Sequence, residues 1–236
     1  MIYDFILIDA DDTLFDFAKC EKQALREAFS QAAIPFDEQV YRDYSEINLS
    51  LWKQLERNEI SREALKTRRF EMLGRRHPLG CSPEALNGFY VQALSEQTFL
   101  IDGAKAFLEQ AARAARLYIV TNGIASTQQR RFAAAGILPY ISGVFISEQI
   151  GAPKPEKAFF DAVFAAIPGF DKKRAVIIGD SLTSDMAGGA AAGIDTCWFN
   201  PAGAPLTEKV RPTYEIQSLS EAIKRMGETQ NVHQEH

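Results

Sequence analysis

The sequence has few cysteines, and they are not arranged as a metal site or a disulfide framework. Cys20, Cys81 and Cys197 are far apart and lack the Cys-x-x-Cys spacing of a zinc site. An odd number of widely separated cysteines also differs from the dense pairing of small secreted domains. We therefore expect a protein of a reducing compartment, in which these cysteines are packing residues.

Long apolar runs and long Lys/Arg-rich runs are also missing. No run approaches the roughly 20 apolar residues that span a bilayer, and strand-like sequence begins near Tyr3, which leaves no room for a signal peptide. The formal charge is −5 at pH 7, so bulk electrostatics does not favour binding to a nucleic-acid polymer or an anionic membrane. We expect a cytoplasmic enzyme that acts on a small molecule.

The sequence does contain enough apolar residues for a substantial core. Hydrophobic residues make up 46% of its 236 residues, which suits a large domain or a domain with a smaller insert. Its most informative stretch runs from Phe5 to Phe15, where four apolar residues are followed by Asp9 and Asp11. Such a run is typical of a strand buried on both faces of a parallel sheet. Open α/β sheets bind ligands beyond the carboxyl ends of their strands, so Asp9 and Asp11 are candidate site residues.

Helical periodicity then continues for some eighty residues. Ser61 and Ser82 are N-cap signals within this block, and Pro83 follows the second at the first helical position. The block is too long for an ordinary connection between a strand and the next helix. We therefore predict a separate helical cap domain at residues 16–97, inserted into a core domain formed by residues 1–15 and 98–236.

The core sequence alternates between strands and helices. This order predicts an α/β fold with a doubly wound parallel sheet and right-handed crossovers. The expected strands after the first lie at residues 117–120, 144–146, 175–178 and 196–199. The expected helices lie at 104–115, 126–135 and 156–167, and a further helix follows Asp185 and ends near residue 192.

Polar residues end or follow several of these strands. They are Asp9 and Asp11, Thr121, Lys154, and Asp180 with Asp185. All parallel strands end at one edge of a sheet, so these residues can converge. Carboxylates are the hard oxygen ligands that Mg²⁺ prefers, and lysine and threonine side chains complement phosphate charge. One carboxylate can attack as a nucleophile and another can protonate the leaving group, so the pattern indicates metal-assisted phosphoryl transfer.

Four short motifs occur in order along the chain: Asp-x-Asp-x-Thr at 9–13, Thr-Asn-Gly at 121–123, Lys-Pro at 154–155 and Gly-Asp-x-x-x-x-Asp at 179–185. In this order they resemble the motifs of the haloacid dehalogenase-like (HAD) hydrolase superfamily. Each motif is weak by itself, but four in order along nearly the whole chain are a strong signal. The resemblance implies a Rossmann-like core with a helical C1-type cap that closes over the site and selects the leaving group.

The resemblance also implies a role for each matched residue. Asp9 would be the nucleophile and Asp11 the general acid and base. The phosphoryl oxygens would be bound by Thr121, Asn122 and Lys154. Mg²⁺ is the implied cofactor, with Asp185 a ligand either directly or through water. The implied metal-binding residues are Asp9, Asp11, Asp180 and Asp185.

A narrower resemblance is to pyrimidine 5'-nucleotidases of the YjjG type. It rests on the stretch from Asp9 to Phe17, on Asn48-x-x-x-Trp52 and on residues 196–200. It implies hydrolysis of nucleoside monophosphates such as UMP, dUMP and dTMP, including those with non-standard bases. The candidates for leaving-group selection are Phe15, Phe17, Asn48 and Trp52, although core packing is the ordinary role of aromatic residues at helical spacing. Asp12 stands where the wider superfamily commonly has glycine.

Other functions remain open on the same core. A sugar-phosphate or general phosphatase would differ only in the cap, and a phosphomutase would return the phosphoryl group to its substrate. A haloacid dehalogenase needs neither Mg²⁺ nor an acid at position 11, so Asp11 argues against it. A catalytically silent binding module should have lost a catalytic carboxylate, and none is missing. The sequence does not decide between a monomer and a homodimer.

Overall fold

The computed structural model describes residues 2–57, 59–207 and 209–227. The chain forms two compact units, one from Met1–Asp16, Leu100–Ala125 and Ala135–His236 and the other from Phe17–Phe99 and Ser126–Ala134. The helical unit thus includes residues 126–134, which the sequence pattern predicts to be part of the core domain. Residues 228–236, the end of the predicted core domain, lie outside the described part.

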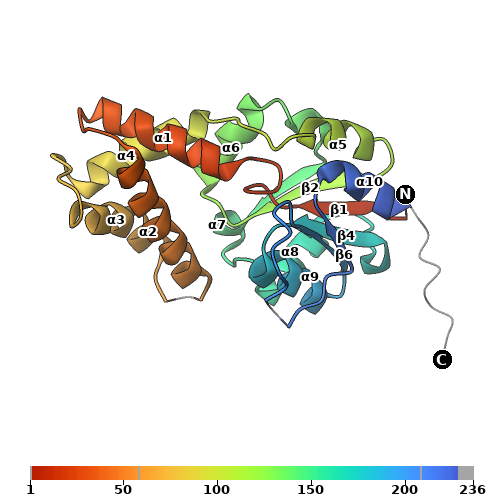
Figure 1. The fold of residues 1–236 in the computed structure, drawn as a ribbon. Helices are drawn as coiled ribbons and strands as arrows, with labels where there is room; N and C mark the ends of the chain where they lie inside the picture. The colour runs from red at the N-terminus through yellow and green to blue at the C-terminus, as the bar shows by residue number, and fades with distance from the viewer. Residues whose placement is uncertain (1, 58, 208, 228–236) are drawn as a thin grey trace. The chain divides into compact units, whose positions relative to one another are not determined.

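The first unit is built on a parallel sheet (Figure 1). Its described residues form six strands in the order β3-β2-β1-β4-β5-β6, and every pairing is parallel. The chain moves outward from β1 through β2 to β3 and then resumes on the other side of β1 with β4, which creates a topological switch point. This confirms the predicted doubly wound α/β fold. The strands are β1 (Phe5–Ile8), β2 (Arg116–Thr121), β3 (Gly143–Ile146), β4 (Ala175–Gly179), β5 (Asp195–Phe199) and β6 (Tyr214–Ile216).

Helices cover both faces of this sheet, with α5 and α10 on one face and α8 and α9 on the other (Figure 1). Phe5 and Leu7 of β1 belong to a buried apolar cluster together with Phe159, Phe160 and Val163 of α8. Burial on both faces explains why β1 is apolar throughout. The helical elements are α5 (Ala104–Ala111), α7 (Ser147–Ile150), α8 (Lys157–Ala166), the π-helical turn η3 (Leu182–Met186), α9 (Ala187–Ala192) and α10 (Leu219–Gly227).

Three of these elements, α7, β6 and α10, are absent from the sequence-based expectation. The helix expected over residues 104–115 is also shorter, because the chain leaves α5 after Ala111 and enters β2 at Arg116. The strand β6 has only three residues, of which Tyr214 and Ile216 are buried and Glu215 is exposed. A pattern this short carries little periodicity, so it is not distinguished from a loop.

The second unit is helical. Its apolar core takes residues from successive helices, including Leu25, Tyr44 and Phe70. Both expected N-caps are confirmed, because Ser61 Oγ accepts from the Ala64 N–H at 3.1 Å and Ser82 caps the helix that starts at Pro83. No helix in the described part of the chain is long and apolar enough to cross a membrane. The helices are α1 (Phe17–Gln31), α2 (Glu38–Glu56), α3 (Arg62–Gly74), α4 (Pro83–Glu96) and α6 (Ala125–Ala134).

Candidate active site

Asp9 and Asp11 follow β1 at the carboxyl edge of the sheet. The Asp9 N–H donates to the Ile178 carbonyl of β4 at 2.9 Å, so the strand ladder still holds this residue in place. The chain then turns sharply, with two N–H groups donating to the Ala10 carbonyl. Asp12 lies in this turn with φ of 56°, a left-handed conformation that glycine adopts freely and aspartate tolerates. Position 12 therefore calls for a residue that tolerates a positive φ.

Lys154 connects the candidate site residues electrostatically. Its side chain is almost fully buried, and Nζ lies 2.5 Å from Asp9 Oδ1 and 2.6 Å from Asp185 Oδ1. Nζ also donates to the Val120 carbonyl at 2.9 Å, next to the end of β2. The carboxyl ends of β1, β2 and β4 are thus joined through a single ammonium group. A buried ammonium with two carboxylate partners and a carbonyl has its three N–H groups satisfied.

The Thr-Asn-Gly motif holds the backbone beside this lysine. Asn122 uses both ends of its amide on Lys154: Nδ2 donates to the Lys154 carbonyl and Oδ1 accepts from the Lys154 N–H, both at 2.9 Å. Thr121 is buried at the end of β2, and its Oγ1 accepts from the Gly123 N–H at 3.1 Å. The Asn122 side chain therefore positions Lys154, and contact of Asn122 with phosphate remains a prediction.

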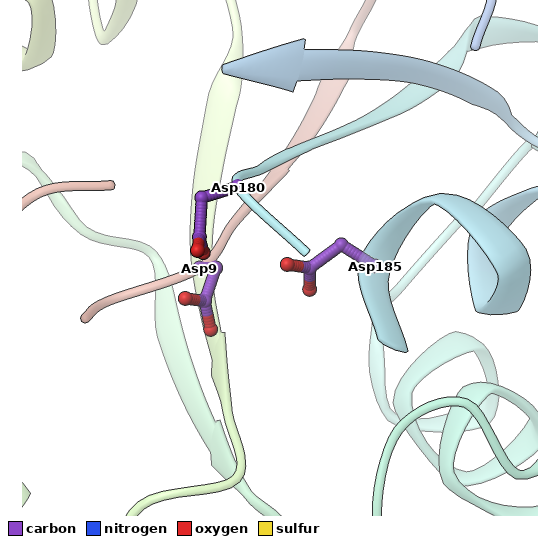
Figure 2. Close-up of side chains that lie close together, drawn as sticks. All are labelled: Asp9, Asp180 and Asp185. Carbon is purple, nitrogen blue, oxygen red and sulfur yellow. The ribbon is translucent and has the colours of Figure 1, made fainter. Parts of the chain in front are cut away.

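Asp180 and Asp185 follow β4 and bring their carboxyl groups toward Asp9 (Figure 2). Each of the three residues contributes an oxygen, and these oxygens lie within 4.8 Å of one another. The π-helical turn η3 carries Asp185, and the Ser181 side chain caps it by accepting from the Ser184 N–H. Local π-helical turns are common at functional sites, and here the turn directs a carboxylate back toward the sheet edge.

The charges at this site strongly affect one another. Burial raises the pKa of the Asp9 carboxyl to about 8, an effect that Lys154 opposes and that Asp185 and Asp11 increase. Burial, together with Asp9 and Asp185, also raises the pKa of Asp180 well above its usual value. Burial alone would lower the pKa of Lys154, but the two carboxylates that contact it outweigh burial and raise it. One ammonium group therefore does not offset the cost of burying several ionised carboxylates, and the protonated forms of Asp9 and Asp180 are favoured.

This donor set fits a divalent cation. Asp9, Asp180 and Asp185 supply carboxylate oxygens from three separate points of the chain, and hard oxygen donors are what Mg²⁺ prefers. A second positive charge would also offset the carboxylate repulsion that Lys154 leaves unbalanced. These three residues are therefore the ones that would hold a metal ion.

The four candidates for leaving-group selection lie in different surroundings. Phe15 is fully buried and offers no surface to a ligand. Asn48 is also buried, and its Nδ2 donates to Glu21 Oε1 at 2.7 Å within the helical unit. Phe17 and Trp52 are only partly buried, against the apolar core of that unit. Of the four, Phe17 and Trp52 keep exposed surface.

Two residues of the site region stand in motifs that the sequence displays but were given no role there. A Cβ atom on Gly179 would overlap the Asp185 carboxylate, so only glycine lets that side chain lie over the end of β4. Trp198 of β5 donates through Nε1 to the Asp180 carbonyl at 2.8 Å. Both residues lie in motifs that the sequence displays, but spacing along a chain does not show such contacts.

Comparison with known proteins places the chain in a family. Residues 3–193 match the family model of haloacid dehalogenase-like hydrolases. The pyrimidine 5'-nucleotidase PynA of Streptococcus pneumoniae is 38% identical over 225 residues, which cover 94% of each protein. The pyrimidine 5'-nucleotidase YjjG of Escherichia coli is 33% identical over 221 residues, covering 94% of this chain and 96% of YjjG.

A solved structure gives the same result. The crystal structure of the HAD-hydrolase YfnB from Bacillus subtilis, bound to magnesium, superposes with a TM-score of 0.90 at 38% identity and covers 95% of this chain and 98% of YfnB. The strand order, the grouping of carboxylates at the sheet edge and these matches agree. The chain therefore belongs to the haloacid dehalogenase-like hydrolase family.

Proposed function

We propose that this hydrolase cleaves phosphate monoesters through an aspartyl-phosphate on Asp9, and that its substrates are pyrimidine nucleoside 5'-monophosphates such as UMP, dUMP and dTMP. The observation that carries the reaction type is the position of Lys154 Nζ between the carboxylates of Asp9 and Asp185, beside Asp180. The choice of substrate is supported by the relatives PynA and YjjG, both named as pyrimidine 5'-nucleotidases.

In the first chemical step, an Oδ of ionised Asp9 attacks the phosphorus atom. The bond from phosphorus to the ester oxygen breaks, and Asp11 gives its proton to the departing alkoxide. Lys154 holds positive charge next to the attacking oxygen, which reduces repulsion between Asp9 and the anionic phosphoryl group. The products are the free nucleoside and a phosphorylated Asp9.

In the second step, Asp11 takes a proton from water and the resulting hydroxide equivalent attacks phosphorus. The bond between phosphorus and the Asp9 oxygen breaks, which releases inorganic phosphate and restores the carboxylate. Thr121 lies at the neighbouring strand end and is proposed to contact phosphoryl oxygens. Mg²⁺, held by Asp9, Asp180 and Asp185 with Asp11 contributing its backbone carbonyl, would supply charge neutralisation at the transferring group.

The helical unit is proposed to select the leaving group. Phe17 and Trp52 are its candidate contacts, since both keep exposed aromatic surface. The buried positions of Phe15 and Asn48 favour roles in packing and hydrogen bonding instead. A sugar-phosphate phosphatase would use the same chemistry with a different leaving group.

A phosphate-release panel tests both parts of the proposal. The wild-type enzyme is assayed with UMP, dUMP, dTMP, purine nucleoside monophosphates and hexose phosphates, with Mg²⁺ present or removed by a chelator. We expect release only with Mg²⁺, and a kcat/KM for the pyrimidine nucleotides at least about tenfold above the others, which is roughly 1.4 kcal/mol of discrimination. Equal activity on hexose phosphates would overturn the pyrimidine assignment, and no release from any ester would overturn the phosphatase.

Removal of the Asn122 side chain tests how Lys154 is positioned. We expect Asn122→Ala to lower kcat roughly 10- to 100-fold, because a small displacement of a charged group from the reacting atoms is costly. Loss of two hydrogen bonds to the Lys154 backbone should also lower the free energy of unfolding by about 1–3 kcal/mol. Steady-state phosphate release and urea unfolding measure the two effects.

Asn200 provides a matched control for this variant. Its amide holds Ala204 in the same way, with Nδ2 donating to the carbonyl and Oδ1 accepting from the N–H, both at 2.9 Å. Asn200→Ala should therefore lose stability while kcat stays within a few fold of wild type. Equal losses of kcat in the two variants would show that the Asn122 side chain does not affect catalysis through the position of Lys154.

A further inference from the structure

Trp198 makes a contact with the candidate metal site that ordinary packing does not require. It lies at the carboxyl end of β5, is 5% exposed, and is paired in register with Gly179 of β4. Its indole Nε1 donates to the backbone carbonyl of Asp180 at 2.8 Å. A side chain of β5 thus holds the peptide group of Asp180, the residue that follows the last paired residue of β4.

The Asp180 peptide needs such a partner because of its place in the chain. The paired register of β4 with β5 ends at Gly179, and the turn η3 begins at Leu182. Between them the backbone has left the strand ladder and has not yet entered the helical turn. A buried carbonyl without a hydrogen bond costs free energy. If this loop had no fixed backbone position, the Asp180 side chain would have no fixed direction either. The indole N–H supplies the hydrogen bond from outside the loop.

This contact bears on the direction of the Asp180 side chain. The Asp180 carboxyl lies with those of Asp9 and Asp185 in the group that would hold Mg²⁺ (Figure 2). Removal of a group that hydrogen-bonds to a metal ligand and orients it commonly lowers metal affinity 10- to 100-fold. A donor that fixes the backbone of a ligand acts in this way without touching the metal.

We propose that Trp198 is a positioning residue for the metal site: its indole N–H anchors the Asp180 carbonyl and so keeps the Asp180 carboxylate directed toward Asp9 and Asp185. This inference rests on the proposed Mg²⁺ dependence of the enzyme. It differs from a purely structural role, because loss of packing around an indole lowers stability without a specific effect on cation affinity.

The test compares the full-length wild type with Trp198→Phe, which keeps an aromatic ring and removes the N–H donor. Mg²⁺ binding is measured by calorimetry in the absence of substrate, and thermal unfolding is measured without metal. We expect the Kd for Mg²⁺ to rise roughly tenfold or more. Trp52→Phe makes the same substitution at the second of the chain's two tryptophans, on the helical unit, and should leave the Kd for Mg²⁺ unchanged.

A second measurement keeps the proposal testable if Trp198→Phe does not fold. In Trp52→Phe, Trp198 is the remaining tryptophan, and we expect Mg²⁺ to change its fluorescence with the Kd found by calorimetry. Asp180→Asn in that background should remove the change. Mg²⁺ binding by Trp52→Phe with no change in its tryptophan emission, or a Trp198→Phe variant with wild-type Kd and lowered stability, would overturn the inference alone. Failure of the wild type to bind Mg²⁺ would overturn the proposed cofactor and this inference together.

Discussion

Asp9→Asn is expected to reduce phosphate release by roughly 10⁴-fold or more, the scale of loss seen when a nucleophile is removed from an enzyme. The amide has nearly the shape of the carboxylate but cannot attack phosphorus. The substitution also removes one of the two carboxylates that contact Lys154. Steady-state assays with the preferred nucleotide measure the loss at saturating Mg²⁺.

The same variant should not be destabilised in the metal-free state. Burial raises the pKa of Asp9 to about 8, so the folded protein disfavours the ionised form. The folded state therefore loses stability relative to the unfolded state as pH rises from the ordinary aspartate pKa toward about 8. Asparagine carries no charge to desolvate. We therefore expect the Tm of metal-free Asp9→Asn to equal or exceed that of metal-free wild type near neutral pH, which separates lost chemistry from lost folding.

Asp161→Asn is a suitable control for Asp9→Asn. Asp161 lies on α8 and forms an exposed ion pair with Lys157, so its loss should leave turnover at the wild-type level. If Asp9→Asn kept activity within tenfold of wild type, a water molecule or another residue would have to be the nucleophile.

Lys154→Met is expected to lower both activity and stability. Methionine fills similar space without charge, which leaves Asp9 and Asp185 facing each other without their shared cation. Removal of one partner from a buried ion pair typically costs about 3–5 kcal/mol of unfolding free energy. Loss of a charge that stabilises the transferring group should reduce kcat by roughly 10²–10³-fold. Urea unfolding of the metal-free protein and phosphate release measure these effects.

The stability loss in Lys154→Met should depend on conditions in a defined direction. Mg²⁺ should restore part of it, because a divalent cation replaces some of the missing positive charge. Lower pH should also restore part of it, because protonation neutralises buried carboxyls whose pKa is raised. Lys157→Met, which removes an exposed lysine, should show none of these changes. A metal-free Lys154→Met protein as stable as wild type would contradict the role given to this ammonium group.

The sequence predicted the fold well where buried strands are long enough to be distinct. Phe5–Ile8 and the run beginning at Ala175 are apolar throughout, as strands covered on both faces must be. Since parallel strands share one carboxyl edge, the polar residues that follow them could be expected to meet. The structure does bring Asp9, Asp180 and Asp185 together with Lys154.

The partners of individual side chains could not be predicted in the same way. Asn122 is engaged with Lys154, 32 residues away, and Trp198 with Asp180, 18 residues away. Such contacts depend on the register between strands and on the path of loops, neither of which is encoded by local periodicity. Even Asn48, whose helical spacing from Tyr44 is that of a buried face, gives no sign in the sequence that Glu21 is its partner.

The proposed mechanism requires a covalent phosphoryl intermediate at Asp9. The decisive measurement is rapid quenching of the wild-type enzyme during turnover of a labelled nucleotide, followed by borohydride reduction and peptide mass spectrometry. An aspartyl-phosphate reduces to homoserine, so we predict homoserine at position 9 only when Mg²⁺ and substrate are both present. Rapid turnover with an unmodified Asp9, or with homoserine at another aspartate position instead, would contradict the mechanism.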